Sequence, residues 1–142
     1  MVYTNEQMTP LVRACIGRRN DYAIQRESGL YVRAGRSLTF DVLRAHLAGG
    51  VTIGTYLIDE RGCCRCAVFD ADSDHGLLLL LDLQARMAAD GLWLYLEGSR
   101  RGGHGWLFLS RPVPAGRLRG WLLPYCPLGV EFYPKQDTAS SE

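Results

Sequence analysis

An apolar segment that ends abruptly in acidic residues is the feature that most limits how this chain can fold. Residues 67–74 read AVFDADSD, so small and apolar side chains are followed at once by Asp70, Asp72 and Asp74. The pattern of 63–72 is typical of a buried strand that ends in carboxylates. Because alternate side chains of a strand share a face, we expect Asp70 and Asp72 to point to the same side of a sheet.

The segments around this strand predict an α+β fold. Strand patterns are expected on both sides of a turn at Ser28-Gly29, at 51–59, and then at 92–99, 105–110 and 129–133. We expect 51–59 and 63–72 to pair as a hairpin. Helices are expected within 37–50, within 73–91 with Ser73 or Asp74 as the N-cap, and within 112–126. This order predicts a small, mainly antiparallel sheet with helices packed on one face.

Composition excludes several classes of protein. The chain has 142 residues, of which 47% are hydrophobic and 22% charged, values that suit one ordinary globular domain. No apolar run is long and clean enough to span a membrane, and the N-terminus lacks the pattern of a signal peptide, which predicts a cytoplasmic protein without a membrane partner. The five cysteines are expected to be free thiols. We expect no zinc at the CCRC cluster of 63–66, because the other cysteines are isolated.

Two aspartates on one face of a strand repel each other unless a cation lies between them. Oxygen ligands at this spacing suit Mg²⁺ or Mn²⁺, although a solvated turn would also explain them. The stretch VEFYPKQD, residues 130–137, contains Glu131 in a predicted strand that can bring a third carboxylate to such an ion. Asp137 is an alternative third ligand.

The stretch SRRGGHGW, residues 99–106, has the residue types of a phosphate site. Two glycines expose backbone N–H groups in the predicted loop RRGGH, and Ser99, Arg100, Arg101 and His104 add donors. A glycine-rich hairpin turn explains the stretch equally well. From Glu97 to Gly120 there are five arginines and one acid, which suits a site handling phosphates and metal together, or else a solvated basic face.

Taken together, VFDAD, SRRGGHGWLF and VEFYPKQD resemble, in this order and spacing, the three motifs of the archaeo-eukaryotic primase superfamily. The similarity is strongest to its small bacterial, plasmid and conflict-system primase-polymerases, and it extends from about Gly17 to Asp137. The resemblance implies an RRM-like sheet in the catalytic core. It also implies a primase-polymerase-like catalytic domain at 17–137. The sequence itself predicts an N-terminal arm at 1–16 before this domain and a polar tail at 138–142 that is expected to be disordered.

The resemblance further implies a role for each matched position. Asp70, Asp72 and Glu131 would hold two Mg²⁺ or Mn²⁺ ions, and His104 would contact the phosphates of a nucleoside triphosphate. The remaining nucleotide contacts would come from Ser99, Arg101, Gly102, Gly103 and Lys135. The nucleic-acid contacts would come from Arg100, Arg117 and Arg119.

The implied function is that of a template-dependent nucleotidyltransferase, a DNA primase or polymerase that uses two metal ions. Its implied partners are nucleoside triphosphates, a single-stranded or primed DNA or RNA template, and a separate helicase or a replication or defence protein. Two alternatives remain open at this point. One is a non-catalytic nucleic-acid-binding module with a degenerate form of the fold, and the other is a metal-dependent nuclease.

Overall fold

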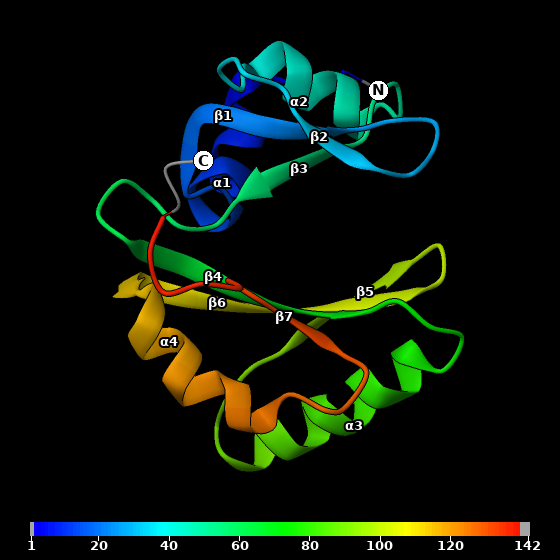
Figure 1. Cartoon of the computed structure of the whole chain (residues 1–142), viewed down its shortest axis with the longest axis vertical. Helices are drawn as coiled ribbons and strands as arrows, with labels where there is room; N and C mark the ends of the chain where they lie inside the picture. Colours follow the sequence, from blue (N-terminus) through cyan, green and yellow to red (C-terminus); the bar gives the residue numbers. More distant parts are fainter. Residues whose placement is uncertain (1, 140–142) are drawn as a thin grey trace.

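The computed structural model describes residues 2–139, and within them the chain forms two antiparallel sheets accompanied by helices. The first sheet has the strand order β2-β1-β3 and the second has the order β5-β6-β4-β7. This is the predicted α+β class, with helices packed on one face of the four-stranded sheet (Figure 1). The three-stranded sheet is separate from the four-stranded one, whereas the sequence patterns predicted a single sheet.

The first 56 residues supply the three-stranded sheet and two helices. Its elements are α1 (Asn5–Cys15), β1 (Arg18–Gln25), β2 (Tyr31–Arg33), α2 (Phe40–Leu47) and β3 (Ile53–Tyr56). Met8 of α1, Tyr22 of β1 and Leu43 of α2 are buried in one cluster. The segment predicted as an N-terminal arm therefore contains a helix that contributes to the core of this unit.

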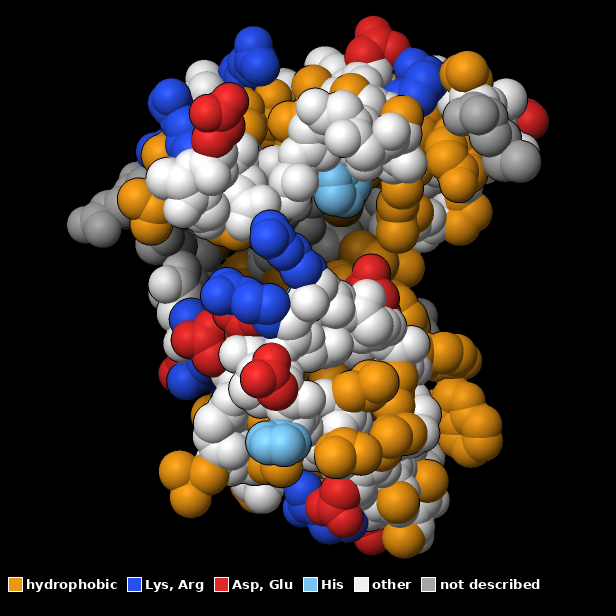
Figure 2. Space-filling model, turned by 90° about the vertical axis from the view of Figure 1, so that its right-hand side faces the viewer, with side chains coloured by type: hydrophobic (Ala, Val, Ile, Leu, Met, Phe, Trp, Pro, Cys, Tyr) orange, Lys and Arg blue, Asp and Glu red, His pale blue; other side chains and the backbone are white. Residues whose placement is uncertain are grey.

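The rest of the chain forms the four-stranded sheet and the two helices beneath it. Its elements are β4 (Cys63–Ala71), α3 (Gly76–Ala89), β5 (Tyr95–Ser99), β6 (Gly102–Pro114), α4 (Ala115–Leu122), a 3₁₀ turn (Leu123–Tyr125) and β7 (Glu131–Tyr133). Helices α3 and α4 cover one face of this sheet, and the first unit lies over the other face (Figure 1). The molecule narrows between the two units (Figure 2).

Strand β4 is the centre of the second unit. Ala67, Phe69 and Ala71 are fully buried, and Phe69 packs edge-on against Phe132 of β7 with 5.1 Å between ring centroids. Their cluster includes the buried leucines of the two helices, which are Leu80, Leu83, Leu118 and Leu122. Burying one such side chain stabilises a fold by about 1.5–3 kcal/mol. The packing of β4 against α3 and α4 therefore fixes the position of the strand that carries Asp70.

The expected hairpin between 51–59 and 63–72 is wrong. Strand β3 pairs with β1 in the first sheet, whereas β4 pairs with β6 and β7 in the second. The physical reason is that β4 is almost entirely buried and both of its edges are occupied, so no edge remains for β3. The connection turns tightly at Asp59, whose carboxylate accepts hydrogen bonds from the backbone N–H groups of Arg61 and Cys63.

Two local expectations also need correction. The N-cap of α3 is His75, without a side-chain capping bond, rather than Ser73 or Asp74. The predicted loop RRGGH is a two-residue turn at 100–101, because Gly102 and His104 already belong to β6. Gly102 is required for packing, since a Cβ atom there would lie 1.8 Å from the carbonyl oxygen of Ala71.

Residues 140–142 of the predicted polar tail lie outside the described residues. Between residues 2 and 139, the structure has no helix with the length and apolar character needed to cross a membrane. Over the same range the cysteines are free thiols, and Cys64 and Cys66 of β4 are buried.

Candidate active site

Four polar side chains form one row across the four-stranded sheet. In the registers of the sheet, Glu97 of β5 lies opposite His104 of β6, His104 lies opposite Asp70 of β4, and Asp70 lies opposite Glu131 of β7. Directly opposed residues of antiparallel strands share a face of the sheet. The sheet therefore brings the first acidic motif, the histidine motif and the third acidic motif together, although 61 positions separate Asp70 from Glu131 along the chain.

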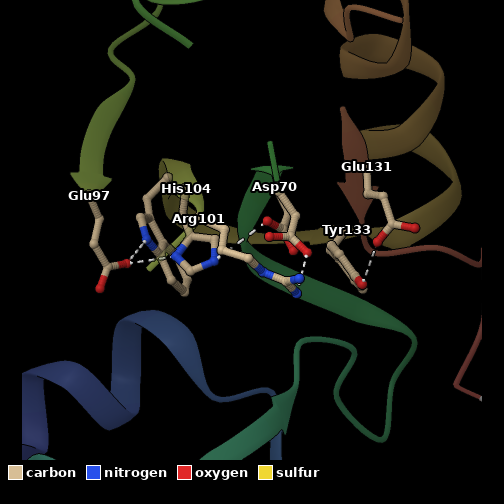
Figure 3. Close-up of polar contacts among 8 residues, drawn as sticks. Asp70, Glu97, Arg101, His104, Glu131 and Tyr133 are labelled. Carbon is tan, nitrogen blue, oxygen red and sulfur yellow. Dashed lines mark hydrogen bonds and ion pairs between the residues drawn. The ribbon is translucent and has the colours of Figure 1, made fainter. Parts of the chain in front are cut away.

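His104 lies between two carboxylates. Its Nδ1 is 3.1 Å from Oε2 of Glu97, and its Nε2 is 3.6 Å from Oδ1 of Asp70 (Figure 3). The same Oε2 atom of Glu97 accepts a hydrogen bond of 2.8 Å from Nε1 of Trp106, two residues further along β6. Glu97 thus contacts both His104 and Trp106 on the neighbouring strand. Its contact with Nδ1 orients the imidazole ring so that Nε2 faces Asp70.

Asp70 is the half-buried member of the row, with 29% of its side chain exposed. Burial is the main reason why the pKa of its carboxyl group is raised. The charges of Asp72 and Glu131 raise this pKa further, whereas those of His104 and Lys135 oppose the shift. The folded protein therefore holds the Asp70 carboxylate in surroundings where a nearby cation would stabilise it.

Asp72 and Glu131 are each engaged by a basic residue. Nη2 of Arg101, in the β5–β6 turn, lies 3.1 Å from Oδ2 of Asp72. Nζ of Lys135 lies 3.1 Å from Oε1 of Glu131. The hydroxyl of Tyr133 donates to Oε2 of Glu131 at 3.1 Å (Figure 3). The hydrogen bond from Lys135, followed by that from Tyr133, lowers the pKa of Glu131. Glu131 is therefore ionised and held on the β7 side of the row.

A pocket of about 500 Å³ opens beside Asp70, between the two units. Its wall includes Tyr133 and Lys135 from the end of the chain, and Arg18 and Tyr56 from the first sheet. The guanidinium carbon of Arg18 lies 4.5 Å from the centroid of the Tyr56 ring. This volume is in the range of pockets that bind small ligands, and the wall combines aromatic rings, two cations and one carboxylate.

The donor chemistry at Asp70 fits a hard divalent cation. Asp70 and Asp72 are two positions apart at the end of β4 and offer carboxylate oxygens, which Mg²⁺ and Mn²⁺ prefer. No group of three or more His, Cys, Asp or Glu side chains that could hold a metal is already gathered in residues 2–139. Asp70, Asp72 and Glu131 would be the residues that hold such an ion, which would compete with Arg101 for Asp72 and with Lys135 for Glu131.

Several residues predicted for phosphates lie at the β5–β6 turn, near the row. Ser99 ends β5, Arg100 and Arg101 form the turn, and Gly102 and Gly103 begin β6. The two glycines allow close packing against the carbonyl groups of Ala71 and Glu97, respectively. The turn therefore presents Arg101 beside Asp72, while Gly102 and Gly103 are part of the sheet.

Other predicted residues are not brought to the row. Arg117 and Arg119 lie on α4, which covers the opposite face of the sheet (Figure 1). Nε of Arg119 is 2.8 Å from Oδ1 of Asp137, and its Nη1 donates to the carbonyl oxygen of Pro134 at 2.7 Å. Asp137, the alternative third ligand, is therefore paired with α4 rather than with Asp70.

Sequence reasoning missed Glu97. A signal was present, because a two-residue turn at Arg100 and Arg101 pairs Ser99 with Gly102 and hence Glu97 with His104. A five-residue loop at RRGGH, as predicted, would not place Glu97 opposite His104.

Comparison with known proteins identifies the family of the chain. The sequence model of the archaeo-eukaryotic primase domain of the TOTE conflict system matches residues 14–124. No curated protein matches the sequence. The matched segment includes Asp70, Asp72, Glu97 and His104, and it covers well over half of the chain. The chain therefore belongs to the archaeo-eukaryotic primase family, in the branch of the TOTE conflict systems, and at the family level it is a primase-like nucleotidyltransferase.

Proposed function

We propose that this protein is a template-dependent primase-polymerase that joins nucleotides to a nucleic-acid 3′ end with Mg²⁺ or Mn²⁺. The observation that carries the proposal is the row in which His104 contacts Asp70 at 3.6 Å and Glu131 lies opposite Asp70 on the next strand. Family membership supports the reaction class. The adjoining pocket of about 500 Å³ offers space for a nucleotide.

In the proposed reaction, a 3′-hydroxyl attacks the α-phosphate of a nucleoside triphosphate, the new phosphodiester bond forms, and pyrophosphate leaves. Two divalent ions, when bound, would neutralise the phosphates and lower the pKa of the attacking hydroxyl. Asp70 and Asp72 would hold these ions, together with Glu131.

The other residues of the site would bind and orient the phosphates. His104 would donate from Nε2 to a phosphate oxygen, with its ring held at Nδ1 by Glu97. Lys135, once displaced from Glu131, would add positive charge to the triphosphate, and Arg101 would do so from the β5–β6 turn. Ser99, Arg100, Gly102 and Gly103 remain predicted contacts beside them.

A primer-extension assay tests this proposal. The protein is incubated with a template, a labelled primer, nucleoside triphosphates and Mn²⁺, beside the variants Asp70→Asn and His104→Ala and the control Asp74→Asn. Asp74 is exposed in the β4–α3 connection and outside the row, so its variant matches the charge change of Asp70→Asn. Metal-dependent extension that is retained in the control and lost in the other two variants supports the proposal. Shortened primer would instead indicate a nuclease.

The engagement of Glu131 by Lys135 and Tyr133 favours a second candidate, the non-catalytic nucleic-acid-binding module. If Glu131 never leaves these two donors, the site keeps two metal-binding carboxylates instead of three. Binding of the primed template without any product, at every Mg²⁺ and Mn²⁺ concentration tested, would support this candidate against the first.

A further inference from the structure

A second pocket, of about 550 Å³, lies on the N-terminal side of the molecule and is strongly basic. Four arginines line it: Arg13 of α1, Arg18 and Arg19 of β1, and Arg65 of β4. Glu60 is the single acidic residue in its wall. Three separate elements thus direct guanidinium groups to one hollow, with a formal excess of three positive charges over the single carboxylate.

In the described part of the chain, three of these arginines lack carboxylate partners, while Arg18 packs over the ring of Tyr56. Arg13, Arg19 and Arg65 are exposed, and none of the three forms an ion pair within residues 2–139. By contrast, Arg33, Arg44 and Arg119 all pair with carboxylates. Four like charges with a single carboxylate among them repel one another, so an anionic ligand would relieve this repulsion.

Arg18 connects this basic pocket with the pocket beside Asp70, because it lines both. The basic pocket and the pocket beside Asp70 are therefore neighbours that share one cation. A polymer of phosphates suits two neighbouring pockets with a shared cation better than one nucleotide does. A pocket of this volume holds a short piece of a single strand and is too small to enclose a duplex.

We propose that Arg13, Arg18, Arg19 and Arg65 form the binding site for the phosphodiester backbone of a single nucleic-acid strand. This inference rests on the proposed function in one respect, namely that the bound strand leads to Asp70 as its template. Contacts of this kind are made to the backbone and not to the bases, so binding is independent of sequence. The site differs from the predicted contacts Arg100, Arg117 and Arg119.

The test compares two triple variants that remove the same charge. One is Arg13→Ala/Arg19→Ala/Arg65→Ala. The other is Arg26→Ala/Arg61→Ala/Arg111→Ala, whose exposed arginines line neither pocket. Binding of a fluorescein-labelled oligothymidine strand is measured by anisotropy over a series of KCl concentrations, without divalent metal. Thermal unfolding verifies that both variants are folded.

We expect the first variant to bind the labelled strand about 100-fold more weakly than the wild type, because each lost arginine contact should weaken binding about fivefold. The slope of log K against log salt should become shallower by about 2, since each phosphate contact on a single strand contributes about 0.7. The second variant should lose less than about threefold. Equal losses in the two variants, or an unchanged salt slope in the first, would overturn the proposal.

Two further experiments distinguish strand binding by these arginines from nucleotide binding and from the proposed catalytic function. A free nucleoside triphosphate should not compete with the labelled strand in the absence of metal, and efficient competition would assign the arginines to the nucleotide instead. Asp74→Asn, an exposed position outside the row, should bind the strand as the wild type does. A protein that binds the strand through these arginines but extends no primer refutes the proposed function alone, whereas extension that is unaffected in the first variant refutes the strand path.

Discussion

The substitution Asp70→Asn should stabilise the metal-free protein while it abolishes metal binding. The Asp70 carboxyl group has a raised pKa, mainly because it is partly buried and also because Asp72 and Glu131 are negative. A raised carboxyl pKa means that ionisation costs more in the folded protein than in the unfolded chain. Asparagine has almost the same shape as aspartate without the charge, so it removes this cost.

The magnitude follows from the position of Asp70 in the sheet. Opposed residues on antiparallel strands have Cβ atoms about 5 Å apart, and two unit charges at this distance repel by about 1 kcal/mol even in a water-like dielectric. His104 on the other side offsets part of the repulsion, while burial adds to the cost of the charge. We expect a net gain of about 1 kcal/mol, or about 3 °C in Tm for a chain of this length.

Thermal unfolding in the presence of a chelator measures this gain at pH 7, with Asp74→Asn as the control that should be neutral. As the pH falls through the raised pKa, Asp70 of the wild type becomes protonated and the advantage of the variant shrinks, vanishing below about pH 4. Adding Mn²⁺ at ten times its Kd should stabilise the wild type by about 1.4 kcal/mol and leave the variant unchanged. A lower Tm for metal-free Asp70→Asn, or equal Mn²⁺ shifts, would refute this reasoning.

Three other substitutions have clear expected outcomes. Glu97→Gln should raise the nucleotide KM in primer extension about fivefold, because it weakens one charge-assisted hydrogen bond to His104 on a half-exposed carboxylate; an unchanged KM would remove Glu97 from the site. Gly102→Ala should lower the free energy of unfolding in urea by about 2 kcal/mol or more through its clash with Ala71, whereas Gly98→Ala, with open space around its Cβ position, should not. Asp21 is hydrogen-bonded to Arg33, which chiefly lowers the pKa of its carboxyl group, so its stabilising effect is present above about pH 4 and lost as the pH falls through the lowered pKa. Asp21→Asn should therefore reduce the free energy of unfolding at pH 7 and make it fall less as the pH is lowered. An acid titration followed by circular dichroism measures this fall, and an unchanged fall in the variant would contradict the prediction.

Patterns within short segments were sufficient to predict most elements. The alternation around Ser28-Gly29 corresponds to the β1–β2 hairpin, and the helix expected within 37–50 corresponds to α2, which Thr39 caps. The apolar run before Asp70 is the buried strand β4. These predictions succeed because local periodicity and capping chemistry are decided by residues close together in the chain.

Pairings between distant segments could not be predicted in the same way. Whether β3 joins β4 or β1 depends on which strand edges the rest of the fold leaves open, and this is not a property of 51–72 alone. The register that sets Glu131 opposite Asp70 is a further long-range result. The pairing of Glu131 with Lys135 is local, but whether it competes with a metal depends on that register.

The most direct test of the proposed active site is an experimental structure of the protein with Mn²⁺ and a nucleoside triphosphate whose α–β bridge cannot be cleaved. We expect Mn²⁺ to bind the carboxylates of Asp70 and Asp72, and Glu131 to be released from Lys135. The phosphates should lie within hydrogen-bond distance of Nε2 of His104. Metal bound elsewhere, or a nucleotide whose phosphates point away from His104, would contradict the proposed active site.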